Sequence, residues 1–185
     1  VKKLAKIIKT NSLEIIGVPT SNSTMELAKE LGIELANLNE VGKLDFVFDG
    51  ADEFDPHLNL IKGGGGALLQ EKIVAKSAKE MIVLADESKQ VNFLGKFPLP
   101  VEIIRFGSDK TISLVKEYLA DHFGKAPTIT LRQKNETPFI SDESHFIIDI
   151  FLGKIKEPKR LNVQLNSIVG VVETGLFTDI ASSVF

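Results

Sequence analysis

Residues 44–85 read LDFVFDGADEFDPHLNLIKGGGGALLQEKIVAKSAKEMIVLA and contain the pattern that decides the fold. Two apolar segments, 44–48 and 81–85, are predicted to be strands, and the continuous apolar run of the second is typical of a parallel strand covered on both faces. Between them, residues from about 67 to 79 are predicted to form a helix. A strand, a helix and a strand in this order indicate a parallel α/β layer.

The residues before position 44 extend the same alternation. Residues 2–9 have helical apolar spacing, and residues 23–26 have the spacing of a capping box, so a second helix is predicted to run from there to Gly32. Residues 12–18 and 33–36 are strand candidates. We therefore expect an α/β fold with a doubly wound, mostly parallel, Rossmann-like sheet.

The pattern changes after the Pro98-Leu99-Pro100 segment. The elements predicted beyond it follow the order βαββαβ, which is typical of a ferredoxin-like unit. Its strands are expected at 101–106, 128–133, 145–151 and 169–177, and its helices at 109–122 and 158–168. We therefore predict an α/β catalytic domain of residues 1–100 and 170–185, and a smaller ferredoxin-like domain of residues 101–169.

Composition excludes several classes of function. The 185 residues include no cysteine, which rules out disulfides and thiolate metal sites, and the formal charge of −3 argues against non-specific nucleic-acid binding. No apolar run approaches the roughly 20 residues of a membrane helix. We expect a cytoplasmic protein without a nucleic-acid or membrane partner. Asp49, Asp52, Asp55 and His57 offer metal-ligand chemistry, but a polar turn is the favoured interpretation and no metal site is predicted.

Asp49 and Asp52 follow the carboxyl end of the strand predicted at 44–48. Ligands of open α/β sheets bind outside the carboxyl ends of the strands, so both carboxylates are positioned to face one ligand. The alternative, equally favoured on position alone, is a turn in which aspartate and glycine serve the backbone geometry.

Lys62 and the glycines that follow it precede the helix predicted from residue 67. Backbone N–H groups at the start of a helix bind anions, and Lys62 adds a positive charge there, so a phosphate or a developing oxyanion suits this segment. The alternative is a flexible glycine loop. Lys89, which follows the strand 81–85, is a further candidate for phosphate binding, although a lone lysine there is more often solvated.

Glu71 is the candidate base. Lys72, Lys76 and Lys79 fall within one narrow arc of the predicted helix, which is expected to be its solvated face, whereas Glu71 lies among apolar positions outside that arc. A carboxylate removed from water has a raised pKa and becomes a useful general base. The alternative is a buried ion pair with a lysine or arginine elsewhere in the chain.

Several motifs in order resemble type A ribose-5-phosphate isomerase over nearly the whole chain. They are DGADE at 49–53, KGGG at 62–65, EK at 71–72, ADESKQVNFLGKFPLPVE at 85–102 and GVVETGLF at 170–177. The resemblance implies an aldose–ketose isomerase that interconverts D-ribose 5-phosphate and D-ribulose 5-phosphate in the pentose phosphate pathway, without an organic cofactor or metal. It also implies a homodimer or homotetramer whose ligand is a small-molecule sugar phosphate.

The resemblance assigns roles to matching positions. Glu71 matches the catalytic base of the family, and Asp49, Asp52 and Lys62 match other active-site residues. The positions that correspond to substrate-binding residues are Asp49, Gly50, Ala51, Asp52, Lys62, Gly63, Gly64, Gly65 and Lys89.

The chain departs from the family pattern near its ends. The family carries a Thr-Gly-Ser-Thr phosphate loop after its first strand, and nothing that matches it occurs before Ser12. We therefore expect that strand and loop to precede Val1, and a further strand to follow Phe185. Two other functions remain open, namely another sugar-phosphate isomerase or deaminase, and a sugar-phosphate-sensing module that keeps the anion loop without needing the base.

Overall fold

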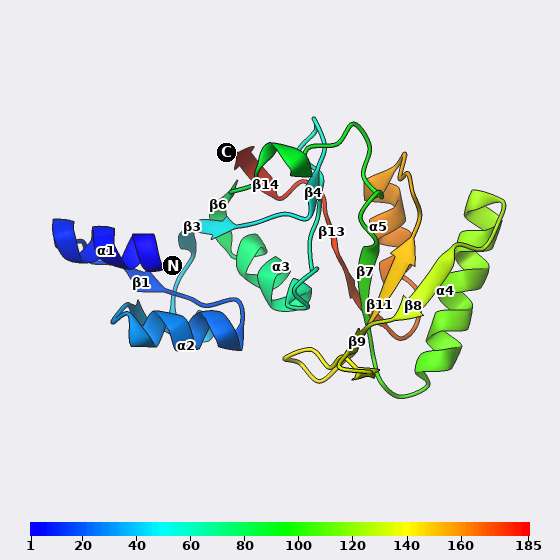
Figure 1. Cartoon of the computed structure of the whole chain (residues 1–185), viewed down its shortest axis with the longest axis horizontal. Helices are drawn as coiled ribbons and strands as arrows, with labels where there is room; N and C mark the ends of the chain where they lie inside the picture. The colour runs from blue at the N-terminus through cyan, green and yellow to red at the C-terminus, as the bar shows by residue number, and fades with distance from the viewer.

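A computed structural model describes residues 1–185 as an elongated molecule with groups of elements arranged along its long axis (Figure 1). Helices α1 and α2 lie at one end, α4 lies at the other, and α3 lies between them. The elements of the first group are α1 (Lys2–Asn11), β1 (Ile16–Gly17), α2 (Asn22–Glu30), β2 (Glu34–Leu35) and a 3-10 turn at Leu38–Glu40.

A parallel sheet forms the next layer. Its central strand β6 (Ala78–Val83) pairs in parallel with β3 (Leu44–Asp49) on one side and β14 (Ala181–Val184) on the other. Strands β1 and β2 also pair in parallel, but each has only two residues. The segments 12–18 and 33–36 are therefore strands over a shorter length than predicted.

Two helix boundaries differ from the prediction. Helix α2 begins after Ser21, whose hydroxyl accepts a hydrogen bond from the Thr24 N–H, so the predicted cap at Ser23 was two residues too late. Helix α3 (Leu68–Lys76) ends before Lys79, with Ser77 as its C-cap, and the Ser77 hydroxyl donates to the Ile73 carbonyl in the last turn. Lys79 therefore lies in strand β6, not in the helix.

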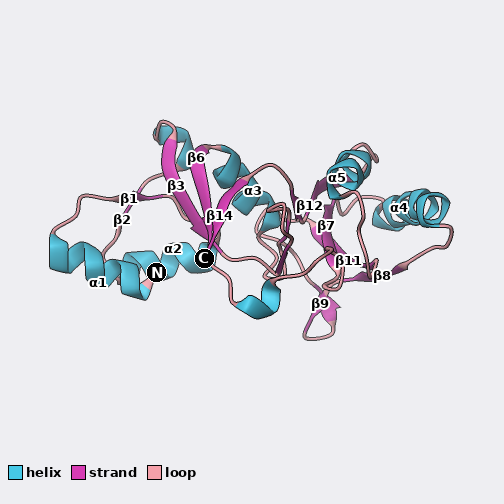
Figure 2. Cartoon of the chain, turned by 90° about the horizontal axis from the view of Figure 1, so that it is seen from above, coloured by secondary structure: helices cyan, strands magenta, loops and turns pink.

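An antiparallel sheet with the strand order β12-β7-β11-β8 forms the far end of the molecule. Helices α4 and α5 lie on the same side of it (Figure 2), and their side chains share one apolar core with those of β7 and β11. The elements of this layer are β7 (Leu99–Ile103), α4 (Ser108–Phe123), β8 (Thr128–Leu131), β9 (Gln133–Lys134), β10 (Thr137–Pro138), β11 (Phe146–Phe151), α5 (Pro158–Asn166) and β12 (Val171–Thr174).

At Gly175 the chain leaves the antiparallel four-stranded sheet and enters a short three-stranded sheet. Strand β12 pairs with β7, whereas β13 (Leu176–Phe177) pairs with β5 (Leu60–Ile61) next to β4 (Glu53–Phe54). The Gly175 N–H donates to the Pro100 carbonyl, and its carbonyl accepts from the Lys62 N–H. A Cβ at Gly175 would lie 2.3 Å from the Lys62 oxygen, so only glycine fits. The chain therefore changes from one sheet to another at Gly175.

Two apolar cores hold these layers. The larger one lies between the antiparallel sheet and its helices, and it includes Ile61 and Leu176 from the short strands. The smaller one packs α3 against the parallel sheet and includes Val47, Met81 and Phe177. No helix of the chain is both long enough and apolar enough to cross a membrane.

Candidate functional site

The ammonium group of Lys62 lies between two carboxylates. Lys62 directly follows β5 and is buried, and its Nζ lies 3.0 Å from Asp49 Oδ2 and 3.3 Å from Glu71 Oε2. The same nitrogen donates to the Gly50 carbonyl at 2.6 Å. Asp49 comes from the end of β3 and Glu71 from the first turn of α3. Three elements thus bring together residues that are 22 positions apart at most in the sequence.

Burial raises the pKa of the Glu71 carboxyl above its ordinary value. The positive charge of Lys62 opposes this shift, and the negative charges of Asp49 and Asp52 add to it. Glu71 Oε2 and Asp49 Oδ2 are both buried, and each faces the Lys62 ammonium as one half of an ion pair. The Lys62 ammonium therefore compensates both carboxylates within the cluster. The ion pair that was the alternative explanation of Glu71 exists, and its partner Lys62 is itself a predicted site residue.

The glycine loop holds Asp52 through its backbone. The Gly64 N–H donates to Asp52 Oδ2 at 2.8 Å, and the N–H of the exposed Gly65 has no acceptor within the chain. Gly63 has a φ of +99°, and a Cβ there would lie 2.8 Å from the side chain of Leu68 at the start of α3. The loop therefore places backbone donors at the helix N-terminus, next to the carboxylate cluster.

A Gly64→Ala substitution will test how closely the loop and Asp52 fit. A Cβ on Gly64 would lie 2.7 Å from Asp52 Oδ1, so the carboxylate must move, and overpacking of this kind costs about 1–3 kcal/mol. Gly65→Ala is the matched control for stability, because a Cβ there meets nothing within 4 Å. Urea unfolding of both variants measures the difference. Equal free energies of unfolding would show that the Asp52 carboxylate can move aside without destabilising the fold.

The remaining predicted residues lie around this cluster. Gly50 supplies the carbonyl that Lys62 contacts, and Ala51 packs against the core of the parallel layer. Lys89 ends a 3-10 turn (Glu87–Lys89), where a bridge between Gln90 and Phe54 places it beside β4, and its ammonium makes no contact with the carboxylates.

The four side chains considered as metal ligands do not converge. No group of three or more histidine, aspartate or glutamate side chains could hold a metal ion. The Asp55 carboxylate accepts hydrogen bonds from the His57 and Asn59 N–H groups and from the Asn59 side chain. Asp55 thus stabilises the turn and does not share a site with Asp49.

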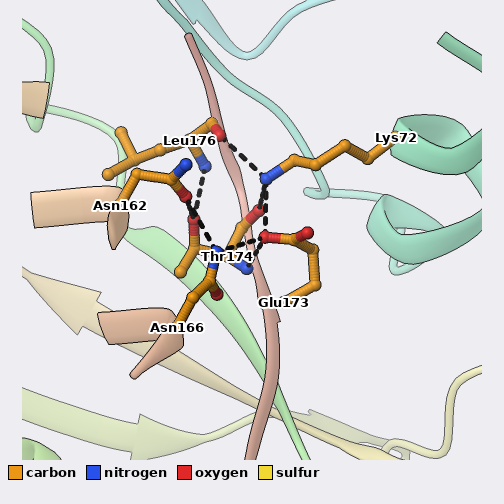
Figure 3. Close-up of polar contacts among 6 residues, drawn as sticks. All are labelled: Lys72, Asn162, Asn166, Glu173, Thr174 and Leu176. Atoms are coloured by element: carbon orange, nitrogen blue, oxygen red, sulfur yellow. Dashed lines mark hydrogen bonds and ion pairs between the residues drawn. The ribbon is translucent and has the colours of Figure 1, made fainter. Parts of the chain in front are cut away.

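Lys72 contradicts the prediction that it lies on a solvated face. It is buried, and its Nζ donates to Glu173 Oε1 at 2.8 Å, to the Thr174 carbonyl at 2.7 Å and to the Leu176 carbonyl at 2.9 Å (Figure 3). Burial lowers the pKa of Lys72, which the charge of Glu173 partly opposes. The partners lie about 100 residues away, so helical spacing alone gave no sign of them. Lys72 fixes α3, and with it Glu71, to the returning chain.

Arg132 was missed by the sequence reasoning. Its Nη1 donates to the carbonyls of Gly63 at 2.6 Å and Gly64 at 3.2 Å, and its other nitrogens pair with the Asp149 carboxylate. Arg132 and Asp149 carry opposite charges and lie in two predicted strands, so the sequence could have suggested that they pair. The pairing of those strands, and the contact with the glycine loop, was not predictable from sequence.

Comparison with known proteins identifies a family for this chain. The family model described as ribose 5-phosphate isomerase A (phosphoriboisomerase A) matches residues 16–185. Ribose-5-phosphate isomerase A from Ruegeria sp. strain TM1040 is 50% identical over 184 residues, which cover 100% of this chain and 70% of the relative. The protein of that name from Cereibacter sphaeroides strain ATCC 17025 is also 50% identical, and 74% of it is covered.

Solved structures agree with the sequence relatives. Ribose 5-phosphate isomerase from Plasmodium falciparum superposes with a TM-score of 0.91 at 35% identity, covering 99% of this chain and 78% of that one. A D-ribose-5-phosphate isomerase in complex with phospho-erythronic acid superposes with a TM-score of 0.88 at 40% identity, covering 97% and 77%. The mixed α/β fold is that of these enzymes, and the chain belongs to the ribose 5-phosphate isomerase A family.

Proposed function

We propose that Glu71 is the base with which this chain interconverts D-ribose 5-phosphate and D-ribulose 5-phosphate through an enediolate. Its family gives it ribose-5-phosphate isomerase activity in the pentose phosphate pathway. The observation that carries the mechanism is the placement of the Lys62 ammonium 3.3 Å from Glu71 and 3.0 Å from Asp49, beside the glycine loop. A base and a cation thus lie together where the sugar would react.

The reaction moves one proton between C1 and C2 of the open-chain sugar. The Glu71 carboxylate takes the C2 proton of the aldose and returns it to C1, and its raised pKa improves it as a base near neutral pH. As the proton leaves, negative charge develops on the sugar oxygens. The Lys62 ammonium and the N–H groups of the glycine loop are preorganised donors for that charge. Asp49 and Asp52 transfer hydroxyl protons and assist ring opening.

The substrate-binding residues extend from Asp49 through Gly50 and Ala51 to Asp52, and from Lys62 through Gly63 and Gly64 to Gly65. Lys89 adds a positive charge for the phosphate. The solved relative with phospho-erythronic acid supports this class of ligand, since that acid combines a phosphate with a carboxylate. The cluster requires no organic cofactor or metal for proton transfer.

The domain organisation is part of the proposal. We assign residues 1–100 and 170–185 to a doubly wound α/β domain and residues 101–169 to a ferredoxin-like domain. The parallel pairing of β3, β6 and β14 supports the first, and the order β7-β11-β8 with two helices on one side supports the second. Strand β12 (Val171–Thr174) joins the antiparallel sheet from beyond residue 169, so that layer extends to Thr174. The family resemblance favours a cytoplasmic homodimer or homotetramer.

An isomerisation assay tests the proposed function against a sensor that only binds the sugar. The chain should convert ribose 5-phosphate in the presence of EDTA, and substrate deuterated at C2 should react more slowly because that bond breaks in the proposed step. Nuclear magnetic resonance of the sugar measures both results. Binding without conversion would favour a sensor, and loss of activity in EDTA that a divalent ion restores would contradict the metal-free mechanism.

A further inference from the structure

Arg132 connects the antiparallel sheet with the glycine loop. It follows β8, and its guanidinium is fixed by Asp149 of the neighbouring strand β11 through two parallel contacts, one of which is Nε to Oδ2 at 2.9 Å. Both side chains are largely buried, with 13% and 17% of their surface exposed. A guanidinium paired on two nitrogens has a fixed plane, so the remaining Nη1 has a defined direction.

That nitrogen contacts the loop at two consecutive carbonyls, Gly63 O and Gly64 O. The Gly63 carbonyl and the Gly64 N–H belong to the same peptide group, and in a trans peptide they point in opposite directions. One end of this peptide therefore meets the Arg132 cation, and the other end meets the Asp52 carboxylate at 2.8 Å. A flipped peptide would turn its carbonyl toward the carboxylate and its N–H toward the cation, so both contacts would become repulsive.

The second contact orients the next peptide group. Because the Gly64 carbonyl points toward Arg132, the Gly65 N–H of that peptide points away from it. This N–H has no acceptor within the chain, and Gly65 is exposed. It is thus a backbone donor that no group of the chain occupies, which is the kind of donor the proposed mechanism uses for the developing oxyanion.

We propose that Arg132, aimed by Asp149, is a positioning residue for the isomerisation. Together with the Gly66 N–H, which donates to the Gly63 carbonyl at 3.0 Å, it sets the direction of two glycine-loop peptides. The Gly64 N–H then holds Asp52, and the Gly65 N–H remains available to the sugar. This inference rests on the proposed function, because it concerns the same site. The antiparallel layer thus takes part in the reaction through Arg132 and Asp149, although neither side chain contacts the substrate.

Steady-state kinetics of Arg132→Lys tests the inference. Lysine keeps the charge but cannot both pair with Asp149 and reach the two carbonyls. We therefore expect kcat to fall by about 10- to 100-fold, since a misplacement near 1 Å can cost about 100-fold. KM should change less than about three-fold, since the side chain does not contact the sugar. Phospho-erythronic acid, whose carboxylate is planar and anionic like the enediolate, should bind more weakly in proportion to the loss of kcat.

Two further variants keep the test decisive. Arg160→Lys changes an exposed arginine paired with Glu157 at 3.4 Å and should leave kcat, KM and inhibitor binding unchanged. Asp149→Asn keeps Arg132 but weakens the pairing that orients its guanidinium, so kcat should also fall. This variant provides the test if Arg132→Lys does not fold. If either variant melts early but retains full kcat while folded, Arg132 is only structural and the inference is wrong.

The outcome is separable from that of the proposed function by measuring Glu71→Gln in the same assay. Full turnover in Glu71→Gln would overturn the proposed base and the inference with it. An inactive Glu71→Gln together with a fully active Arg132→Lys would overturn the inference alone.

Discussion

Turnover of ribose 5-phosphate will fall roughly a hundred-fold or more in a Glu71→Gln variant, which is the scale of losing a general base. Glutamine keeps the size and much of the hydrogen-bonding capacity of glutamate but cannot accept the C2 proton. Affinity for the substrate should change far less, because Lys62, the glycine loop and Lys89 are retained.

Stability of the Glu71→Gln variant should hold within about 1 kcal/mol. The Lys62 ammonium loses one partner but keeps Asp49 at 3.0 Å and the Gly50 carbonyl at 2.6 Å, so it is not left as an unpaired buried charge. Turnover and melting temperature are to be measured on one preparation, with Glu80→Gln as the control, because Glu80 is an exposed residue of β6. A variant that melts early but retains near-normal turnover would end the catalytic assignment of Glu71.

Lys72→Met is expected to cause the largest loss of stability. Methionine has a similar length, but it cannot replace the three hydrogen bonds of Lys72 Nζ, so it leaves two buried carbonyls and the Glu173 carboxylate without their donor. Removing one partner of a buried pair costs about 3–5 kcal/mol. Asn166 and the Thr174 N–H still donate to Glu173, which favours the lower end of that range. A loss of about 3 kcal/mol lowers the melting temperature of a chain of this size by about 6–12 °C.

Lys79→Met is the matched control for that measurement. Lys79 also pairs with a carboxylate, Asp45 at 2.7 Å, but both side chains are more than half exposed and the pair is screened by solvent. Its melting temperature should remain close to that of the unchanged chain. Similar shifts in melting temperature in the two variants would mean that burial does not determine how much these lysine contacts stabilise the fold.

Local patterns predicted the elements that local chemistry determines. The strand from residue 44, the glycine loop and the helix that carries Glu71 follow from apolar runs and turn residues, and so does the position of Asp49 at a strand end. The resemblance to a family implied that Lys62 and Glu71 both belong to an active site, and in the structure their charged atoms lie 3.3 Å apart.

Residues with distant partners were the ones that sequence patterns could not place. Lys72 shares a helical arc with Lys76, but the returning chain near Thr174 covers only Lys72. The contact of Arg132 with the glycine loop spans 68–69 residues and depends on how two sheets are set against each other. The start of α2 was set by Ser21, whose hydroxyl caps the helix in place of the nearby Ser23.

The hydrogen bond between Gly175 and Pro100 means that the whole antiparallel layer enters and leaves the molecule at a single point. Such a layer is an insertion with adjoining ends. Its length is nearly neutral for the rest of the chain, because the entropy of closing a loop rises by only about 0.6 kcal/mol for each doubling of its length. Loops of this layer away from Arg132 and Asp149 can therefore change in length without altering the spacing of the reacting groups, provided that the junction at Gly175 is kept.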